Sequence, residues 1–192
     1  KAPLELTPEE DLRKNFETVV IGNILLTQEF IPHFKKRKSG LILTTTSLAG
    51  IIALPLDGVY GAAKHALTSM CESIYYELKP FDVKVKIIIP GATQTAFKMQ
   101  PFCIDGYEKA NANQQDFLRD GKSEGADVSE SVETIWEAIT DNKDKIHYPS
   151  DKVALKLYNQ YMEMGIEKYK EFSNKFENDI FEAINLETCV MQ

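Results

Sequence analysis

Residues 60–67 read YGAAKHAL and place a tyrosine and a lysine four positions apart among small or apolar residues. On a helix, side chains i and i+4 lie on the same face, so Tyr60 and Lys64 would be neighbours. The phenol of tyrosine has an ordinary pKa of about 10, which is too high for ready proton transfer at neutral pH. A nearby ammonium favours the phenolate and lowers that pKa, so the pair is a candidate for general acid–base catalysis.

The spacing alone does not single out this pair, because Tyr-x-x-x-Lys occurs three times in the chain, also at Tyr75–Lys79 and Tyr148–Lys152. For each pair, the ordinary alternative is a helix-surface tyrosine beside a solvated lysine. The second pair lies at the polar end of its predicted helix. Pro149 disfavours the helix that the third pair would need. Context therefore favours the first pair as a functional one.

The elements that would position this pair alternate between helix and strand. Thr7 followed by Pro8 is typical of a helix start, and Ser129 or Ser131 is the expected N-cap of a later helix. This alternation predicts an α/β fold with a parallel sheet. Apolar spacing and turn residues predict a helix at 7–36, a strand at 41–46, a helix at 59–79, a strand at 83–89, a helix ending at 139, a strand at 145–148, and helices at 151–162 and 166–184.

Two further marks stand at fixed distances from Tyr60, each directly after a predicted strand. Ser47 lies thirteen residues before it, and Pro90 with Gly91 lies thirty residues after it. Ligands of open parallel sheets bind beyond the carboxyl ends of the strands. Taken singly, Ser47 is an ordinary loop serine, and the Pro-Gly pair is an ordinary turn. Their joint spacing predicts that these groups converge on one site.

Composition excludes several classes of function. The net charge of −7 argues against a nucleic-acid partner, and no apolar run reaches the roughly 18 residues of a membrane span. The three cysteines, Cys71, Cys103 and Cys189, are too far apart for a local metal motif or a disulfide framework. We therefore expect a cytoplasmic protein without a metal site.

The run GLILTTTSLAGIIALPLDGVYGAAKHAL and the later run VKVKIIIPGATQTAF resemble the short-chain dehydrogenase/reductases, as does NFETVVIGNILLTQEFIPHF upstream. The resemblance is close over about 4–97 and looser to residue 148. It implies a Rossmann-like, doubly wound parallel sheet. It also implies an NAD or NADP cofactor and hydride transfer between its nicotinamide and a small carbonyl or alcohol substrate. The choice between NAD and NADP stays open.

The resemblance also implies a role for each marked residue. Tyr60 would be the general acid in reduction and the base in oxidation, and Lys64 would also hold the cofactor ribose. Ser47 would donate a hydrogen bond to the substrate oxygen. A homo-oligomer, dimer or tetramer, would form through helices 7–36 and 59–79. The cofactor-binding residues at the turn after the second strand would be Pro90, Gly91, Thr93 and Thr95, with the Thr93 backbone and the Thr95 hydroxyl at the carboxamide.

The chain departs from this family in two ways. It contains no Gly-x-x-x-Gly-x-Gly turn for the pyrophosphate, so we expect an incomplete sheet without its first strands and a fragment inactive alone. In this interpretation 1–150 is the C-terminal part of the domain, with a lid at about 92–127, and 151–192 is a helical extension. Val19 stands where the family often has asparagine. The alternative is a non-catalytic relative that binds a dinucleotide or a protein.

Overall fold

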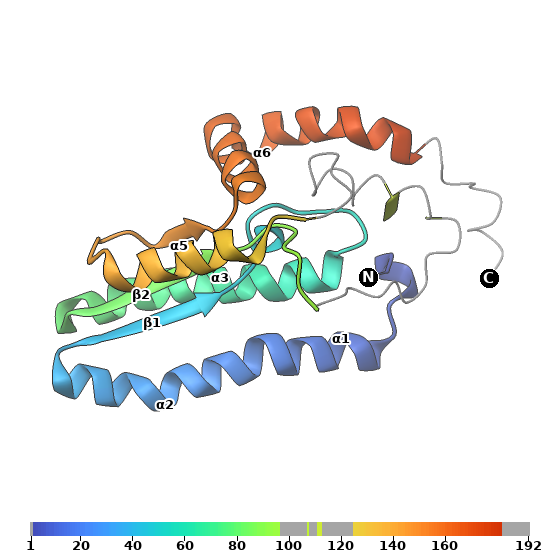
Figure 1. Cartoon of the computed structure of the whole chain (residues 1–192). Coiled ribbons are helices and arrows are strands. Elements are labelled where there is room, and N and C mark those ends of the chain that lie inside the picture. Colours follow the sequence, from blue (N-terminus) through green and yellow to red (C-terminus); the bar gives the residue numbers. More distant parts are fainter. Residues whose placement is uncertain (1, 97–106, 108–110, 113–124, 182–192) are drawn as a thin grey trace.

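The computed structural model describes residues 2–96, 107, 111–112 and 125–181, with side chains described up to residue 173 (Figure 1). Its centre is a sheet of parallel strands in the order β1 (Gly40–Thr45), β2 (Val83–Ile89) and β3 (His147–Pro149). Ile42 pairs with Val85, and Ile87 pairs with His147. The α/β prediction is confirmed, and β2 has the predicted bounds.

Helices cover both faces of this sheet. The helix α3 (Gly58–Leu78) connects β1 to β2 and packs behind the strands, whereas α5 (Val128–Thr140) lies in front of them (Figure 1). Alternate residues of β2 accordingly enter two cores. Ile87 and Ile89 pack in the core that includes Cys71 of α3, and Ile88 packs with Ala138 of α5. The run of three isoleucines is therefore buried on both faces, as predicted.

The long N-terminal helix is interrupted by a π-helical turn. It comprises α1 (Glu9–Phe16), the π turn η2 (Glu17–Ile21) and α2 (Gly22–Arg37), after a short 3-10 turn, η1 (Leu4–Leu6). The prediction that Thr7 caps this helix is wrong. The Thr7 hydroxyl instead donates to the Pro3 carbonyl at 3.1 Å, and the extended Pro8 precedes the first helical residue.

Carboxylates, rather than the predicted serines, cap the C-terminal helices. At the start of α5, the Asp127 carboxylate accepts from the Ser129 amide at 2.8 Å. Ser131 lies inside the helix, where its hydroxyl is hydrogen-bonded to the Ser150 hydroxyl, so it is not available as a cap. The helix α6 (Lys152–Phe181) is broken at Gly165, whose φ of 71° is left-handed. The predicted break between two C-terminal helices is therefore confirmed.

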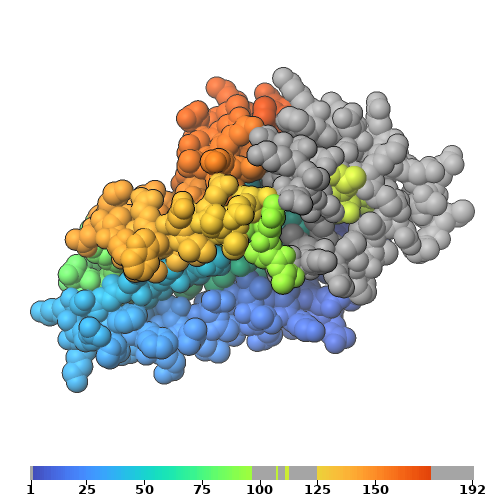
Figure 2. Space-filling model, in the orientation of Figure 1, coloured from blue at the N-terminus to red at the C-terminus, as the bar shows by residue number. Residues whose placement is uncertain are grey.

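The remaining short elements are the 3-10 turns η3 (Leu48–Gly50) and η4 (Lys79–Phe81), which flank α3. Most of the predicted lid at 92–127 lies outside the described residues. Along one flank of the molecule, α1 and α2 form a continuous surface, drawn in blue in Figure 2. Large apolar side chains exposed on α2 are Leu25, Leu26 and Phe30. Within the described ranges, no helix is both long and apolar enough to cross a bilayer.

Candidate active site

The loop after β1 carries Ser47 to the start of α3. Both the amide and the hydroxyl of the buried Thr46 donate to the Ile88 carbonyl, at 2.9 and 3.3 Å, which ties the loop to β2. Ser47 follows in an extended conformation and caps η3, because its Oγ accepts from the Ala49 amide at 3.2 Å. A hydroxyl that accepts in this way can still donate its own hydrogen.

Ser47, Tyr60 and Lys64 come together at this point. Ser47 lies close enough to Tyr60, in the first turn of α3, for its side chain to lower the pKa of the phenol. The Lys64 Nζ lies 5.8 Å from the centroid of the Tyr60 ring and donates to the Thr45 carbonyl at 3.2 Å. Gly50 permits this close approach of loop and helix, because an added Cβ would lie 2.9 Å from the Lys64 carbonyl oxygen.

Burial governs the protonation of the pair. It raises the pKa of Tyr60 above its ordinary value, the hydrogen bond from Ser47 lowers that pKa, and the charge of Asp57 raises it. Burial also lowers the pKa of Lys64. The expectation that Lys64 brings the pKa of Tyr60 down is therefore wrong for this structure. The physical reason is that desolvation of the phenolate outweighs its stabilisation, and the ammonium is bonded to a backbone carbonyl.

Asp57 is a feature of the site that sequence reasoning missed. It is 2% exposed, lies directly before α3, and its backbone carbonyl accepts from the Gly61 amide at 2.6 Å. Its side chain makes no cap hydrogen bond to the helix. An aspartate before a helix is usually a cap, so the sequence carried no signal that the charge of this carboxylate raises the pKa of Tyr60.

The turn after β2 joins the same site from the neighbouring strand. The Leu48 amide donates to the Pro90 carbonyl at 2.8 Å, so the exits of β1 and β2 are bonded directly to each other. The Gly91 amide donates to the Asp151 carboxylate at 2.7 Å. The structure thus brings Pro90 and Gly91 to the loop that carries Ser47.

Thr93 and Thr95 follow with different surroundings. Thr93 pairs with Ala126 in an isolated parallel bridge, and the Gln94 amide donates to the Ala126 carbonyl at 2.9 Å. Within the described part of the chain, the Thr93 Oγ1 is buried without a hydrogen-bond partner. Thr95 is exposed. A buried hydroxyl without a partner fits a polar ligand group such as the carboxamide of a nicotinamide, so the residues present agree with the implied cofactor.

Val19 lies within the π turn η2, where its carbonyl accepts from the Asn23 side chain at 2.8 Å. One turn earlier, the Asn15 Oδ1 is buried and has no hydrogen-bond partner among the described residues. The valine side chain offers no polar atom for a proton relay. The effect of this substitution on catalysis stays a prediction.

The second Tyr-x-x-x-Lys pair forms an exposed surface contact. The Lys79 Nζ donates to the Tyr75 hydroxyl at 3.0 Å, and both groups also bond the exposed Asp144, each at 2.8 Å. Hydrogen bonds to Asp144 and Tyr75 raise the pKa of Lys79. This pair matches the ordinary alternative of a helix-surface tyrosine beside a solvated lysine.

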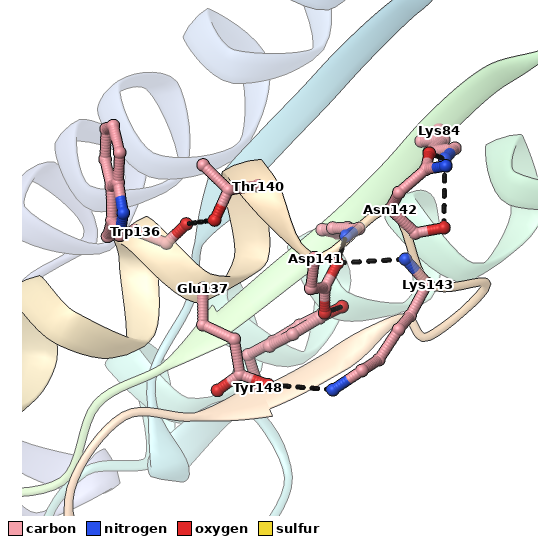
Figure 3. A network of polar contacts seen from close by, with 9 residues as sticks. Lys84, Trp136, Glu137, Thr140, Asp141, Asn142, Lys143 and Tyr148 are labelled. Carbon is pink, nitrogen blue, oxygen red and sulfur yellow. Dashed lines mark hydrogen bonds and ion pairs between the residues drawn. The ribbon is translucent and has the colours of Figure 1, made fainter.

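The tyrosine of the third pair belongs to a buried polar network (Figure 3). The Tyr148 hydroxyl donates to Asp141 at 2.8 Å, and the buried Lys86 pairs with the same carboxylate. Burial alone would raise the pKa of Asp141, but the bond from Lys86 holds it well below its ordinary range. This network joins β2, β3 and the end of α5. Across the described ranges, no cluster of three or more His, Cys, Asp or Glu side chains could hold a metal ion.

A crossover from β1 through α3 to β2, with a serine, a tyrosine and a lysine close together at the strand exits, is the arrangement of a Rossmann-like parallel sheet with a candidate site at its carboxyl end. Residues 1–102 match the family described as short chain dehydrogenase. The chain belongs to this family. Over 152 residues it is 31% identical to an uncharacterized oxidoreductase of Schizosaccharomyces pombe, a match that covers 78% of this chain and 64% of that protein.

Two solved structures share the fold. A short-chain dehydrogenase from Streptomyces avermitilis matches with a TM-score of 0.74 and 25% identity, over 92% of this chain and 64% of that one. A short chain dehydrogenase from Burkholderia cenocepacia, solved in complex with NADP, matches with a TM-score of 0.67 and 20% identity, over 91% and 63% of the two chains. The chain thus spans just under two thirds of the length of these relatives.

Proposed function

We propose that the protein containing this chain is an NAD(P)-dependent oxidoreductase that acts on a carbonyl or alcohol substrate. The observation that carries the proposal is the convergence of Ser47, Tyr60 and Lys64 at the exit of β1, where the neighbouring Leu48 amide is hydrogen-bonded to the turn that leaves β2. Family membership supports the reaction type.

Ser47 and Tyr60 both act on the substrate oxygen. When bound, the reduced dinucleotide supplies the hydride that adds to the carbonyl carbon. The electron pair of the carbonyl π bond moves to oxygen, which then takes a proton from Tyr60 and leaves an alcohol and a phenolate. Ser47 donates a hydrogen bond to the same oxygen as its negative charge grows, an interaction often worth a few kcal/mol in the transition state. The phenolate regains its proton from water.

Lys64 and the turn after β2 would hold the dinucleotide. The Lys64 ammonium has donor hydrogens beyond the one it gives to Thr45, and these suit the ribose hydroxyls. The buried hydroxyl of Thr93 and the exposed Thr95 suit the carboxamide of the nicotinamide. Pro90 and Gly91 would support one side of the ring.

The direction of the pKa shift favours reduction. A raised pKa keeps the Tyr60 phenol protonated at neutral pH, which is the form that donates a proton to a growing alkoxide. Oxidation needs the phenolate, which burial disfavours. We therefore expect carbonyl reduction to be faster than alcohol oxidation near neutral pH.

The test is direct detection of hydride transfer by the full-length gene product. The protein is incubated with NADH or NADPH carrying deuterium at the transferring position of C4 and with a panel of ketones, and the products are analysed by mass spectrometry. Deuterium on the carbinol carbon of a product supports the proposal. Binding of the dinucleotide without transfer to any ketone, and without oxidation of the matching alcohols, would contradict it.

That outcome would favour the alternative, a non-catalytic relative that binds a dinucleotide or a protein. Val19, which offers no polar side chain at the relay position, is the observation on its side. The presence of Ser47, Tyr60 and Lys64 together at the exit of β1 favours the enzyme, because a binding module has no need for this combination of side chains.

A further inference from the structure

A buried carboxylate outside the proposed chemistry holds the turn after β2. Asp151 is 5% exposed and lies directly before α6. Its Oδ1 accepts from the Ala154 amide at 2.8 Å and so caps the helix, while its Oδ2 accepts from the Gly91 amide at 2.7 Å. Helix capping needs only one acceptor oxygen. The second oxygen is used on the turn.

The contact at Gly91 also restricts which residue can stand there. A Cβ added to Gly91 would lie 3.0 and 3.1 Å from the two carboxylate oxygens of Asp151 and 3.4 Å from the Ala154 Cβ. The glycine therefore lets the turn approach α6 closely enough for its amide to reach the carboxylate.

The turn after β2 is also hydrogen-bonded to the loop that carries Ser47. The Leu48 amide, next to Ser47, donates to the Pro90 carbonyl at 2.8 Å. On the other side, the Ser150 amide donates to the Ile89 carbonyl at 3.0 Å. The Asp151 carboxylate and two backbone hydrogen bonds thus connect the start of α6 to the turn expected to contact the nicotinamide and to the loop that carries Ser47.

We propose that Asp151 is a positioning residue that fixes the turn at 90–95 for the nicotinamide by holding the Gly91 amide. This inference rests on the proposed function, since it concerns how the same site binds its dinucleotide. Asp151 acts through Gly91 and α6, so it is predicted to change cofactor affinity more than the proton-transfer step.

The test separates the two bonds of the carboxylate with the variant Asp151→Ser. A serine at a helix N-cap still accepts from the Ala154 amide, but its shorter side chain does not reach Gly91. Asp127→Ser is the matched control, because Asp127 caps α5 through the Ser129 amide. Asp151→Asn is the second variant, since its amide group offers one acceptor in place of two.

Dissociation constants for NADH and NADPH are measured on the full-length protein by fluorescence titration, and amide hydrogen exchange is followed at Gly91 and Ala154. Loss of a hydrogen bond to a charged acceptor predicts about tenfold weaker binding for Asp151→Ser and Asp151→Asn, and less than about twofold for the control. The Gly91 amide should exchange faster in Asp151→Ser, while the Ala154 amide stays protected.

Unchanged dinucleotide affinity together with unchanged exchange of the Gly91 amide in Asp151→Ser would overturn the inference. Equal loss of protection at Gly91 and Ala154 would also overturn it, because it would show that Asp151 acts only as a helix cap. If the wild-type protein binds neither dinucleotide, the proposed function is what fails. The exchange of the Gly91 amide still decides whether Asp151 holds the turn.

Discussion

Tyr60 is surrounded by groups that act on its proton in opposite directions. Burial and the charge of Asp57 favour the phenol, and the hydrogen bond from Ser47 favours the phenolate. The net effect is a raised pKa, which keeps the Tyr60 phenol protonated at neutral pH and suits the proton donor proposed above. Asp57 is the member of this group whose charge can be removed with little change of shape.

Asp57→Asn should lower the pKa of Tyr60, because it removes a negative charge that disfavours the phenolate. Carbonyl reduction needs the protonated phenol, so the alkaline limb of the kcat/KM profile should move to lower pH. The profile is measured by consumption of the reduced dinucleotide across neutral and alkaline pH. Asp144→Asn, at the exposed Tyr75 contact, should leave the profile in place; a profile of Asp57→Asn that stays or moves to higher pH would refute this role.

At the scale of elements, the exits of β1 and β2 determine the site. Thr46 and Leu48 both donate to carbonyls at the end of β2, so the serine loop and the Pro-Gly turn have a fixed relative position. The first turn of α3 then places Tyr60 against the loop. A substitution that shifts this loop or this turn should therefore alter dinucleotide binding or turnover even though Ser47, Tyr60 and Lys64 are all still present.

Gly91→Ala tests the closeness of the turn to α6. The new Cβ would lie 3.0 Å from the Asp151 carboxylate, so the carboxylate and the turn must separate slightly, at a cost of about 1–3 kcal/mol that is typical of overpacking. We expect the KM for the dinucleotide to rise about tenfold or more. Gly58→Ala is the control, because a Cβ there would meet no atom within 4 Å. Equal KM values for the two variants would contradict this account of the turn.

The buried network of Lys86, Asp141 and Tyr148 should matter for stability rather than for catalysis (Figure 3). Lys86→Ala leaves a buried carboxylate without its cation, which predicts a loss of about 3–5 kcal/mol in the free energy of unfolding. Denaturant titration measures this loss. Lys79→Ala, which removes an exposed ion pair, should have little effect, and an equally small effect of Lys86→Ala would show the network to be dispensable.

The same network predicts a dependence on pH with a definite sign. The pKa of Asp141 is depressed in the folded state, so its contribution to stability is present above the unfolded pKa and is lost as the pH falls through the folded value. Asp141→Asn should therefore flatten the decline of stability toward strongly acidic pH. A decline as steep as that of the wild type would assign it to other groups.

The sequence was sufficient for the order and type of the main helices and strands and for the convergence of Ser47, Tyr60 and Lys64, because hydrophobic periodicity and the positions of residues relative to strand ends are visible along the chain. It was not sufficient for the helix caps or for the π turn in the long helix. It was insufficient for Asp57 and Asp151. Carboxylates directly before helices are ordinary caps. Only the packed structure shows that the second oxygen of Asp151 accepts from Gly91 and that the charge of Asp57 acts on Tyr60. The direction of the Tyr60 pKa shift was also missed, since desolvation depends on tertiary burial.

At the scale of the whole molecule, the chain spans 64% of the length of its Schizosaccharomyces pombe relative, so its activity is proposed for the complete protein. The flank formed by α1 and α2 (Figure 2) exposes apolar side chains, with Leu26 61% and Phe30 50% exposed. Such a patch is typical of an interaction surface. We propose that two copies of the protein associate through this flank.

Leu26→Glu should shift the full-length protein toward the monomer, because a charge at a symmetric interface is buried in both copies. Light scattering after size-exclusion chromatography measures the mass. Leu155→Glu on α6, where the leucine is 48% exposed, is the control and should leave the mass unchanged. A wild-type monomer, or an oligomer insensitive to Leu26→Glu, would exclude this flank as the interface.

The most direct measurement compares Tyr60→Phe with Tyr75→Phe, since both tyrosines lie on α3 four residues before a lysine. Turnover of a ketone and binding of NADH or NADPH are measured on the same preparations. Loss of the proton donor predicts that Tyr60→Phe lowers kcat by about 100-fold or more with dinucleotide binding retained, whereas Tyr75→Phe stays within about twofold of wild type. Comparable turnover of the two variants would contradict the assignment of Tyr60 as the proton donor.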